Sequence, residues 1–291
     1  MQSNDQSTSP VNLSSALRVA MARAVHQLLD EPRVFEDVYA LPVLGERLSA
    51  SLRDDPFRFN DPVMRTIRAA VVARSVYAEQ KLAQGIDGGI RQYVLLGAGL
   101  DTYALRQTAP NLTVYEVDLP AALASKRASM QALSVCAQEA ARHVPCDLQH
   151  EALLTALQAH GFKLDQPAFV SWLGVTPYLG TDRVEQTLEA LGQLAPGSQV
   201  VFDYRVAPAL LSPLEQAMEA HAAELFARMG EPWRSSFEPA QLRRMLEAAG
   251  FAWGEDLGSE EINQRYFPRR KDGLQASGGG FRLLHAMRVR A

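Results

Sequence analysis

Cysteine is scarce in this chain, whose 291 residues include two, Cys136 and Cys146, outside any Cys-x-x-Cys pair. A disulfide framework and a cysteine-based zinc site are therefore not expected, and no other metal site is predicted. Long apolar runs are missing too, since none reaches the roughly 18 residues that span a bilayer. The polar N-terminus also lacks the layout of a secretory signal. These absences favour a cytoplasmic protein with no membrane partner.

A strong excess of one charge is also lacking. Lysine and arginine total 29 against 33 aspartate and glutamate residues, which gives a net charge of −4. This balance gives no indication of a nucleic-acid partner or of an acidic membrane surface. Hydrophobic residues make up 47% and charged residues 21% of the chain. Such a composition is ordinary for a globular protein and excludes intrinsic disorder.

The N-terminal third of the chain has helical patterns. Apolar residues at helical spacing predict a helix that starts near residue 13, with Ser14 or Ser15 as its N-cap, and that Pro32 ends. A broken, proline-containing stretch follows. A second long helix is predicted at 63–84, closed by Gly85.

From residue 92 onward, short apolar runs alternate with helical stretches, which is typical of a parallel sheet covered on both faces. The runs lie at 92–96, 113–117, 168–173 and 198–202, and the helical stretches at 121–141, 150–160 and 183–194. Two later runs, 251–257 and 281–289, are joined by a glycine-rich link, which favours a final antiparallel pair. Residues 206–238 form a helical insertion. We expect one α/β domain over residues 1–291.

The first apolar run ends in Gly97-Ala98-Gly99-Leu100-Asp101-Thr102, a strand that enters a tight Gly-x-Gly turn. Glycine lets the backbone turn sharply and lets a ligand approach without a Cβ in the way. A dinucleotide would place its pyrophosphate here, but Thr102 replaces the third glycine of that motif. The carboxylate of Asp101 would also repel a pyrophosphate. It tolerates a phosphate-free cofactor with a cationic amino-acid end, which points to S-adenosylmethionine.

Two acids end the next apolar run, in Val114-Tyr115-Glu116-Val117-Asp118. The position of Asp118 predicts that it lies at the carboxyl end of the neighbouring strand, where it can accept both ribose hydroxyls. Glu116 shares its strand parity, so one acid contacts the ribose and the other is a structural acid paired nearby. Asp118 is the favoured ribose ligand. NAD and S-adenosylmethionine share this ribose, so the acid supports an adenosine ligand without choosing between them.

Five blocks of residues then occur in order. They are Arg74-Ser75, the segment 93–106 around the glycine turn, Tyr115-Glu116-Val117-Asp118-Leu119-Pro120, Cys146-Asp147-Leu148, and Ser171-Trp172-Leu173-Gly174-Val175-Thr176-Pro177-Tyr178-Leu179. Together they resemble the leucine carboxyl methyltransferase-like family of class I S-adenosylmethionine-dependent methyltransferases, particularly its bacterial branch. The resemblance implies a Rossmann-like fold with a seven-stranded, mostly parallel sheet, one antiparallel strand, helices on both faces and an N-terminal helical lid.

The resemblance also implies a role for each matching residue. Arg74 matches the arginine that binds the cofactor carboxylate, and the glycine turn lines the methionine end. Asp118 holds the ribose. Asp147 and Leu148 match the pair at the adenine, where a carboxylate meets the exocyclic amine and a backbone group meets a ring nitrogen. From the residues alone, Arg74 can also be a solvated helix charge and Asp147 a helix N-cap.

One position departs from the family. Its eukaryotic members carry a glutamate near the sulfonium after the fourth strand, whereas this chain has Trp172-Leu173-Gly174. An aromatic face such as Trp172 can attract the sulfonium by a cation–π interaction. We therefore expect Trp172 and Leu173 to line the cofactor, and we do not carry over the phosphatase-methylating function itself.

The acceptor is predicted from the bases that the chain offers. A carboxylate is already ionised at pH 7 and needs no base, whereas a hydroxyl does. The six histidines lie outside the motif blocks, and His221 in the insertion is the one candidate base. We predict O-methylation of a small molecule on a carboxylate or hydroxyl, with a carboxylic acid favoured. Arg205 is the candidate cation for that acid, and Tyr178 is a candidate hydrogen-bond donor.

Residues 13–62 and the insertion 206–238 are expected to form a lid over the acceptor pocket, where Trp233 is a further candidate for substrate contact. Two other functions stay open at this point. An NAD-dependent oxidoreductase is disfavoured by Asp101 and Thr102. A non-catalytic protein that binds an adenosine cofactor is allowed by the missing family glutamate.

Overall fold

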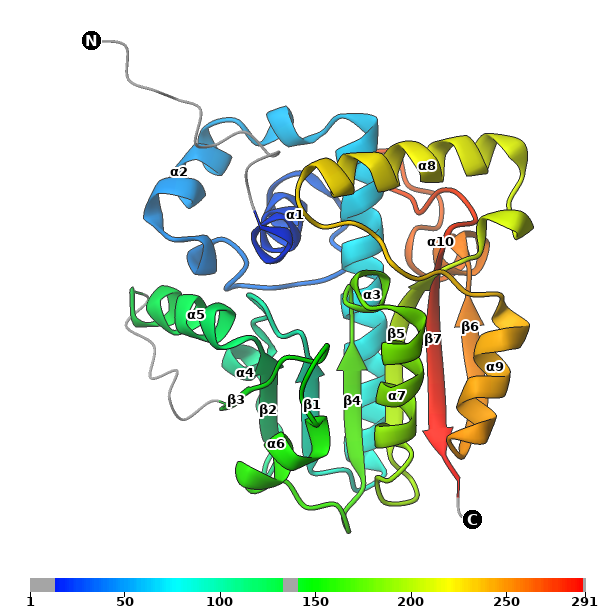
Figure 1. Cartoon of the computed structure of the whole chain (residues 1–291). Helices are drawn as coiled ribbons and strands as arrows, with labels where there is room; N and C mark the ends of the chain where they lie inside the picture. The colour runs from blue at the N-terminus through cyan, green and yellow to red at the C-terminus, as the bar shows by residue number, and fades with distance from the viewer. Residues whose placement is uncertain (1–13, 133–140, 290–291) are drawn as a thin grey trace.

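A computed structural model of the chain describes residues 14–132 and 141–289. Figure 1 shows a twisted sheet between helices, with a further helical layer above one end of the strands. Within the described residues the strand order is β3-β2-β1-β4-β5-β7-β6. The strands are β1 (Gln92–Leu96), β2 (Thr113–Asp118), β3 (Arg142–Pro145), β4 (Ala168–Trp172), β5 (Gln199–Arg205), β6 (Phe251–Leu257) and β7 (Phe281–Arg288).

The direction of the strands confirms the predicted sheet. Strands β1 to β5 pair in parallel, whereas β7 is antiparallel to both β5 and β6. Strand β1 pairs with β2 on one side and with β4 on the other, so the chain order reverses between β1 and β4. A crevice forms at such a switch point outside the carboxyl ends of the strands, and ligands bind there in open α/β sheets.

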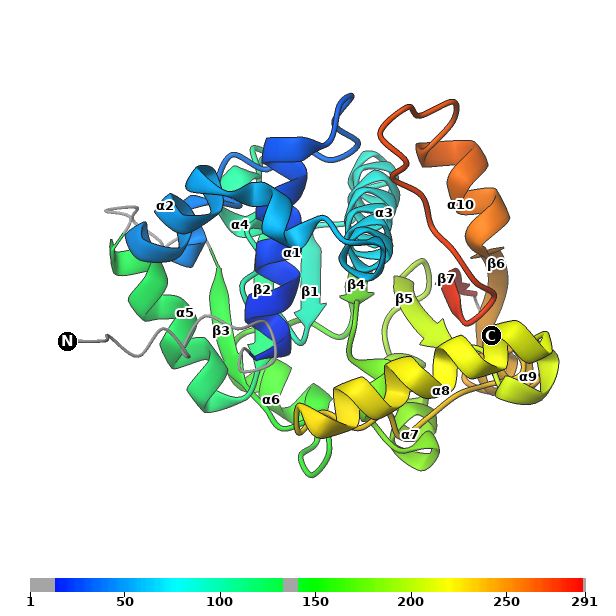
Figure 2. The same ribbon diagram turned by 90° about the horizontal axis from the view of Figure 1, so that it is seen from above.

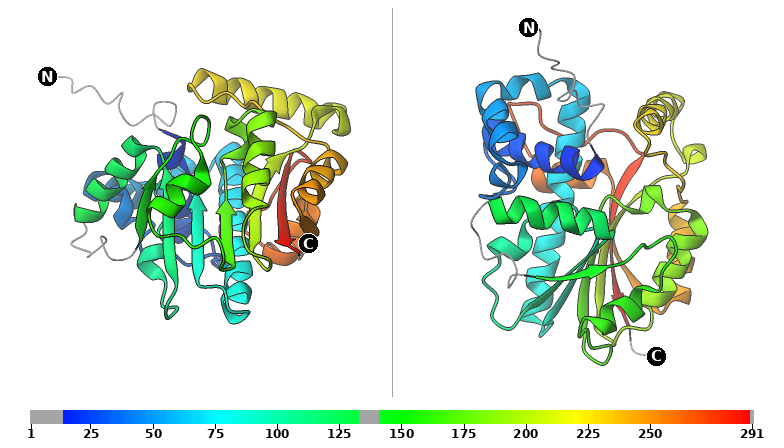
Figure 3. Two further views of the ribbon diagram at one scale, coloured as in Figure 1. Left: turned by 60° about the horizontal axis from the view of Figure 1, so that its bottom comes forward. Right: turned by 60° about the vertical axis from the view of Figure 1, so that its left-hand side comes forward.

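Helices cover both faces of this sheet, as the side view in Figure 3 shows. One core is shared with α3 (Pro62–Asp87), α4 (Tyr103–Arg106) and α10 (Ser259–Tyr266). The other core is shared with α6 (Leu153–Ala159), α7 (Thr181–Leu191) and α9 (Pro239–Ala248). Within the described residues every helix is too short or too polar to cross a membrane.

Some predicted boundaries are corrected. Gly85 does not close α3 but lies inside it. A Cβ at this position would lie 3.0 Å from Ile90 Cδ1, so the missing side chain lets the end of α3 pack closely on its neighbours. The helix cap is Gly88 instead. Helix α5 (Pro120–Ala132) covers the start of the helix predicted at 121–141, and positions 133–140 of that prediction lie outside the described residues, as does position 13.

The first helical segment forms an N-terminal cap, defined here as residues 14–61. Its elements are α1 (Ser15–Leu29), η3 (Pro42–Leu44), α2 (Glu46–Asp54) and η4 (Pro56–Phe59). Ser14 caps α1 as predicted, accepting from Leu17 N. The cap has its own apolar core, which includes Met130 of α5. Arg68 of α3 anchors it through a buried pair with Asp30, with Arg68 Nε 2.7 Å from Asp30 Oδ2.

The insertion lies on the same end of the sheet as the cap. It contains η6 (Pro208–Leu210) and α8 (Pro213–Arg228), which begins with a Ser212–Glu215 capping box. Figures 1 and 2 show α8 crossing above the strands on the side away from α2. Helix α8 is described in full, and none of its 16 residues is buried. The cap and α8 therefore flank the end of the sheet at which the switch point lies.

Candidate cofactor and acceptor site

The glycine turn after β1 is tightly held. Gly97 and Gly99 have φ angles of +71° and +46°, which favour glycine. Both Gly97 N and Ala98 N donate to Val117 O, at 2.8 and 3.1 Å. A Cβ on Gly97 would overlap Val175 Cγ2, so the turn approaches the segment after β4 as closely as the backbone allows.

Asp118 lies where the sequence predicts it, at the end of β2 beside the glycine turn. Its Oδ2 accepts from Gly99 N and its Oδ1 from Leu119 N, each at 2.7 Å. A carboxylate offers about four lone-pair sites, so both oxygens keep capacity for further hydroxyl donors. The side chain is half-buried, and it remains a candidate ribose ligand.

Glu116 does not reach the site. Its side chain is buried, with Oε1 2.7 Å from Lys126 Nζ and Oε2 3.2 Å from His143 Nε2. A buried carboxylate needs a partner of opposite charge, and Lys126 of α5 provides one. The predicted contact of Glu116 with the cofactor is therefore not supported, and this acid is the structural one of the pair.

Asp101 lies against the N-terminal cap. Its Oδ2 is 3.3 Å from Arg23 Nη1, and its Oδ1 accepts from Tyr103 N at 2.7 Å. Burial alone would raise the pKa of Asp101, but the Arg23 and Lys126 charges lower it below its usual range. An ionised acid thus stands beside the glycine turn. Helix α1 also covers this turn, since a Cβ on Gly99 would lie 3.2 Å from Ala16 Cβ.

Arg74 of α3 reaches the turn that follows β4. A Cβ on Gly174 would lie 2.6 Å from both terminal nitrogens of Arg74, so the guanidinium lies directly on this glycine. Asp203 of β5 joins the two, because Oδ2 is 3.3 Å from Arg74 Nη1 and Oδ1 accepts from Gly174 N at 2.5 Å. No sequence motif includes Asp203. An acid inside an otherwise apolar strand was the available signal, because a buried carboxylate requires a partner.

Asp147 and Leu148 follow β3 and stay partly exposed. Asp147 Oδ1 accepts from Gln149 N at 2.8 Å, and Oδ2 is 2.9 Å from His150 Nδ1. The hydrogen bond with His150 lowers the pKa of Asp147. Helix α6 begins later, at Leu153, so Asp147 is not its N-cap. It shapes a turn and keeps a carboxylate at the edge of the sheet.

Trp172 and Leu173 differ from the prediction. The indole of Trp172 is fully buried in the core with α6, α7 and α9, and its ring centroid lies 5.8 Å from that of Phe202. A ring inside this core presents no face to a sulfonium, so the expected cation–π contact is not supported. Leu173 is half-buried and packs on the core at the opposite face, with α3.

Tyr178 lies in η5 (Thr176–Tyr178), after β4. Burial raises the pKa of Tyr178, and the nearby Glu231 charge raises it further against the opposing effect of Arg74 and Arg18. The phenol is therefore protonated at neutral pH and can donate a hydrogen bond. The segment after α8 holds η5 in place, since Arg234 N donates to Pro177 O at 2.6 Å.

Arg205 ends β5 and faces the insertion. It forms an ion pair with Glu219 of α8, and its guanidinium lies 4.4 Å from the ring centroid of Trp233. Among the described residues, Arg205 Nε has no hydrogen-bond partner although it is buried. His221, the candidate base, is exposed on α8.

A further link, which no motif in the sequence predicts, joins the cap to the insertion. Arg18 of α1 forms an ion pair with Glu231, and Glu231 Oε1 accepts from Ser15 N at 2.8 Å. The two segments expected to form a lid are thus in direct contact.

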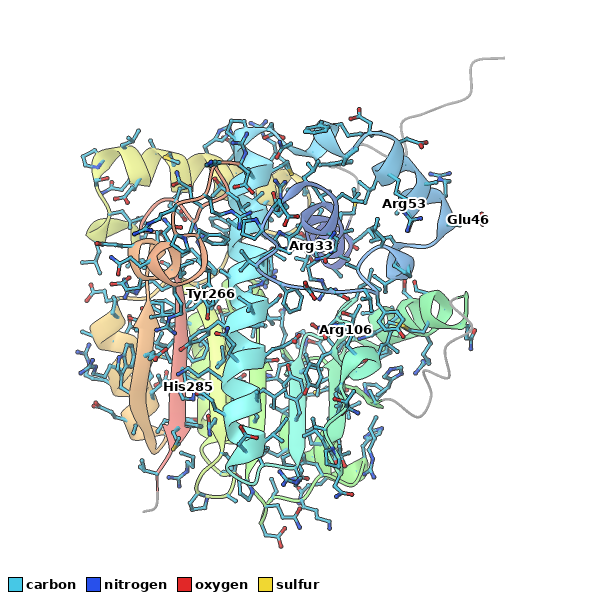
Figure 4. All side chains as sticks on the ribbon, turned by 180° about the vertical axis from the view of Figure 1, so that it is seen from behind. Arg33, Glu46, Arg53, Arg106, Tyr266 and His285 are labelled. Carbon is cyan, nitrogen blue, oxygen red and sulfur yellow. The ribbon has the colours of Figure 1, made fainter. Side chains whose placement is uncertain are left out.

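Arg106 of α4, labelled in Figure 4, ties the cap to α3 by pairing with Asp37 and Glu79.

The donor set fits a zwitterionic nucleoside. Arg74 lies on the turn after β4 and Asp101 beside the turn after β1, a cation and an acid such as an amino-acid end requires, and Asp118 and Asp147 follow β2 and β3. A sequence model of the family described as Leucine carboxyl methyltransferase matches residues 16–192. The chain belongs to the leucine carboxyl methyltransferase family.

Relatives of this family member extend over most of its length. YktD of Bacillus subtilis, named as an S-adenosyl-L-methionine-dependent methyltransferase, is 29% identical over 285 residues, covering 90% of this chain and 93% of YktD. A protein of Mycobacterium avium named as the same type of enzyme is 30% identical over 283 residues, covering 84% of this chain and 87% of that protein.

Solved structures share the fold at low identity. A structure from Thermobifida fusca described as a methyltransferase has a TM-score of 0.59 and 19% identity, covering 92% of this chain and 94% of its own. Magnesium protoporphyrin IX methyltransferase of Synechocystis, with bound S-adenosylhomocysteine, has a TM-score of 0.50 and 16% identity, covering 82% and 94%. The predicted Rossmann-like methyltransferase fold is confirmed.

The predicted class of enzyme is confirmed with the family. This leucine carboxyl methyltransferase family member is an S-adenosylmethionine-dependent methyltransferase, and S-adenosylmethionine is its cofactor. The oxidoreductase alternative is therefore set aside, as is the non-catalytic one.

Proposed function

We propose that this methyltransferase transfers the methyl group of S-adenosylmethionine to a carboxylate of a small molecule. The observation that carries the proposal is Arg205, a guanidinium at the carboxyl end of β5, the strand beside β4. An anionic acceptor needs a cation at the site, and arginine binds carboxylates with directed hydrogen bonds. Tyr178, kept protonated by burial, is a second donor for such an acceptor.

The side chains around the site favour a carboxylate over a hydroxyl, because a hydroxyl acceptor requires a base. His150 is paired with Asp147 at the edge of the sheet, and His221 is exposed on α8. The raised pKa of Tyr178 leaves no phenolate at neutral pH. An acceptor that is already ionised avoids this requirement.

The residues of this chain bind the cofactor and the acceptor and orient them for the transfer. When bound, S-adenosylmethionine supplies the methyl group: the carboxylate oxygen bonds to the methyl carbon as the C–S bond breaks with its electron pair going to sulfur, which gives S-adenosylhomocysteine and a neutral methyl ester. Arg74 binds the carboxylate of the cofactor, and Asp118 binds its ribose. Asp147 and Leu148 bind the adenine, while the glycine turn and Leu173 line the methionine end.

The N-terminal segment 13–62 and the insertion 206–238 act as the lid that excludes water from the transfer. The contact of Arg18 with Glu231 supports this role, because it joins the two segments on the side of the sheet where the strands end. Ser15 N, which donates to Glu231, adds a second connection.

The test is a transfer assay with labelled S-adenosylmethionine and paired acceptors, each carboxylic acid beside the alcohol or phenol of the same skeleton. We expect labelled methyl esters, identified by mass spectrometry and by release of methanol in mild alkali. Arg205→Gln should lose turnover and keep the affinity for S-adenosylhomocysteine. Alkali-stable methyl ethers without any ester would contradict the proposal.

A further inference from the structure

Arg205, the cation proposed to bind the acceptor, is already paired with a carboxylate of the protein itself. Glu219 of α8 forms its ion pair with Arg205, and both side chains are mostly covered, at 21% and 16% exposure. Gly280, in the glycine-rich link before β7, makes room for this carboxylate, because a Cβ at that position would overlap it. The guanidinium and the bare glycine backbone thus form a place shaped for one carboxylate group.

Aromatic rings fix this guanidinium. The ring of Trp233 lies 4.4 Å from the guanidinium carbon of Arg205, and Phe226 stacks on Trp233 at 5.2 Å between centroids. Stacking on an aromatic face orients a guanidinium and leaves the donors on its edge for a planar anion. The buried Nε of Arg205, unpartnered within the described chain, is one such donor.

The helix that carries Glu219 is weakly anchored. None of the residues of α8 is buried, and Leu214 and Met218 are 72% and 52% exposed. Helix α1 in the cap differs, since six of its residues are buried. Elements with few buried apolar contacts open at low cost in free energy. Glu219 therefore belongs to an element that can shift away from Arg205 without unfolding the core.

We propose that Glu219 is a built-in competitor that holds the place of the acceptor carboxylate on Arg205, so that an acceptor displaces it readily only by bringing a carboxylate of its own. This inference rests on the proposed function. Exchange of one carboxylate for another keeps Arg205 paired throughout, whereas a neutral acceptor that displaced Glu219 would leave a covered cation without a partner.

The same exchange explains release of the product. A methyl ester is neutral and forms no ion pair with Arg205, so Glu219 regains its place when the ester has formed. The acceptor's negative charge thus governs both its entry and, once removed, its departure.

The test uses Glu219→Gln, which keeps the size of the side chain and removes its charge. The probes are 1-naphthoate and the matched neutral 1-naphthamide, titrated calorimetrically into the enzyme saturated with S-adenosylhomocysteine. Loss of a competing, partly covered ion pair should strengthen naphthoate binding by about 5-fold, and naphthamide should remain the weaker ligand of both proteins. The control is Glu224→Gln on the same helix, whose pair with Arg228 is exposed, at 61% and 70%.

The inference would be overturned by naphthoate binding that is unchanged or weaker in Glu219→Gln, or by no saturable naphthoate binding to that variant. Naphthamide that binds as tightly as naphthoate, or an equal gain for naphthoate in Glu224→Gln, would overturn it too. The proposed function is judged separately, by ester formation in the transfer assay, so its failure is distinguishable from failure of these binding results.

Discussion

Arg74 offers the most specific test of how the cofactor binds. Its side chain is 12% exposed and lies on Gly174, and Arg74 Nη1 is 3.3 Å from Asp203 Oδ2. Hydrogen bonds to a charged partner contribute about 1.5–3 kcal/mol, and Asp203 already neutralises part of the Arg74 charge. We therefore expect Arg74→Ala to weaken binding of S-adenosylhomocysteine by about 2 kcal/mol, or roughly 30-fold in Kd.

The assay is isothermal titration with S-adenosylhomocysteine and, separately, with adenosine, which lacks the amino-acid end. Adenosine affinity should stay unchanged. Arg74→Ala also leaves Asp203 buried without its cation, which should lower the free energy of unfolding by about 1–3 kcal/mol. The double variant Arg74→Ala/Asp203→Asn should recover much of that stability and none of the affinity. Equal losses for both ligands, or an unchanged affinity for S-adenosylhomocysteine, would refute a contact with the cofactor carboxylate.

Three further predictions follow from single contacts. Asp118→Ala should weaken S-adenosylhomocysteine and adenosine alike, by about 1–3 kcal/mol, and a loss confined to one of them would exclude a ribose contact. Gly174→Ala forces a left-handed backbone (φ +69°) on alanine and places its Cβ 2.6 Å from Arg74. Calorimetry should therefore show weaker binding of S-adenosylhomocysteine and a free energy of unfolding lower by about 1–2 kcal/mol. Wild-type values for both quantities would contradict this packing. Burial, assisted by the Lys81 charge, lowers the pKa of His285 to about 4 from the 6.5 expected when unfolded. The unfolded chain then takes up the proton first, so stability should fall between pH 6.5 and 4.5 by about 2–3 kcal/mol. His285→Gln should flatten that slope in urea unfolding at the two pH values, and an identical slope would show that His285 titrates normally.

The fold could be predicted because its signals are local. Strands β1, β2, β4 and β5 are short apolar runs, and the Gly-x-Gly turn marks the end of the first, whereas the parallel strand β3 (Arg142–Pro145) has no such pattern. The predicted boundaries differ from the structure where tertiary packing, and not local sequence, determines the role of a residue. Gly85 resembles a helix end, but its missing side chain serves contact with Ile90 and Phe169. Periodicity within one segment does not report such contacts.

The site was predictable only where a motif carries it. Strand β4 is buried on both faces, so its sequence did not reveal that Trp172 points into the core. Pairs formed across the chain were also out of reach: 213 positions separate Arg18 from Glu231, and 129 separate Arg74 from Asp203. The first pair depends on how the cap and the insertion meet above the sheet, and the second on how α3 packs on β5. No local pattern encodes either arrangement.

The central claim is that a phosphate-free nucleoside with a zwitterionic end lies along the carboxyl ends of β1 to β4. A crystal structure of the enzyme with S-adenosylhomocysteine tests it most directly. We predict ribose hydroxyls on Asp118, the adenine at Asp147 and the amino-acid carboxylate on Arg74. A nucleoside bound elsewhere, or one whose carboxylate lies away from Arg74, would contradict the account.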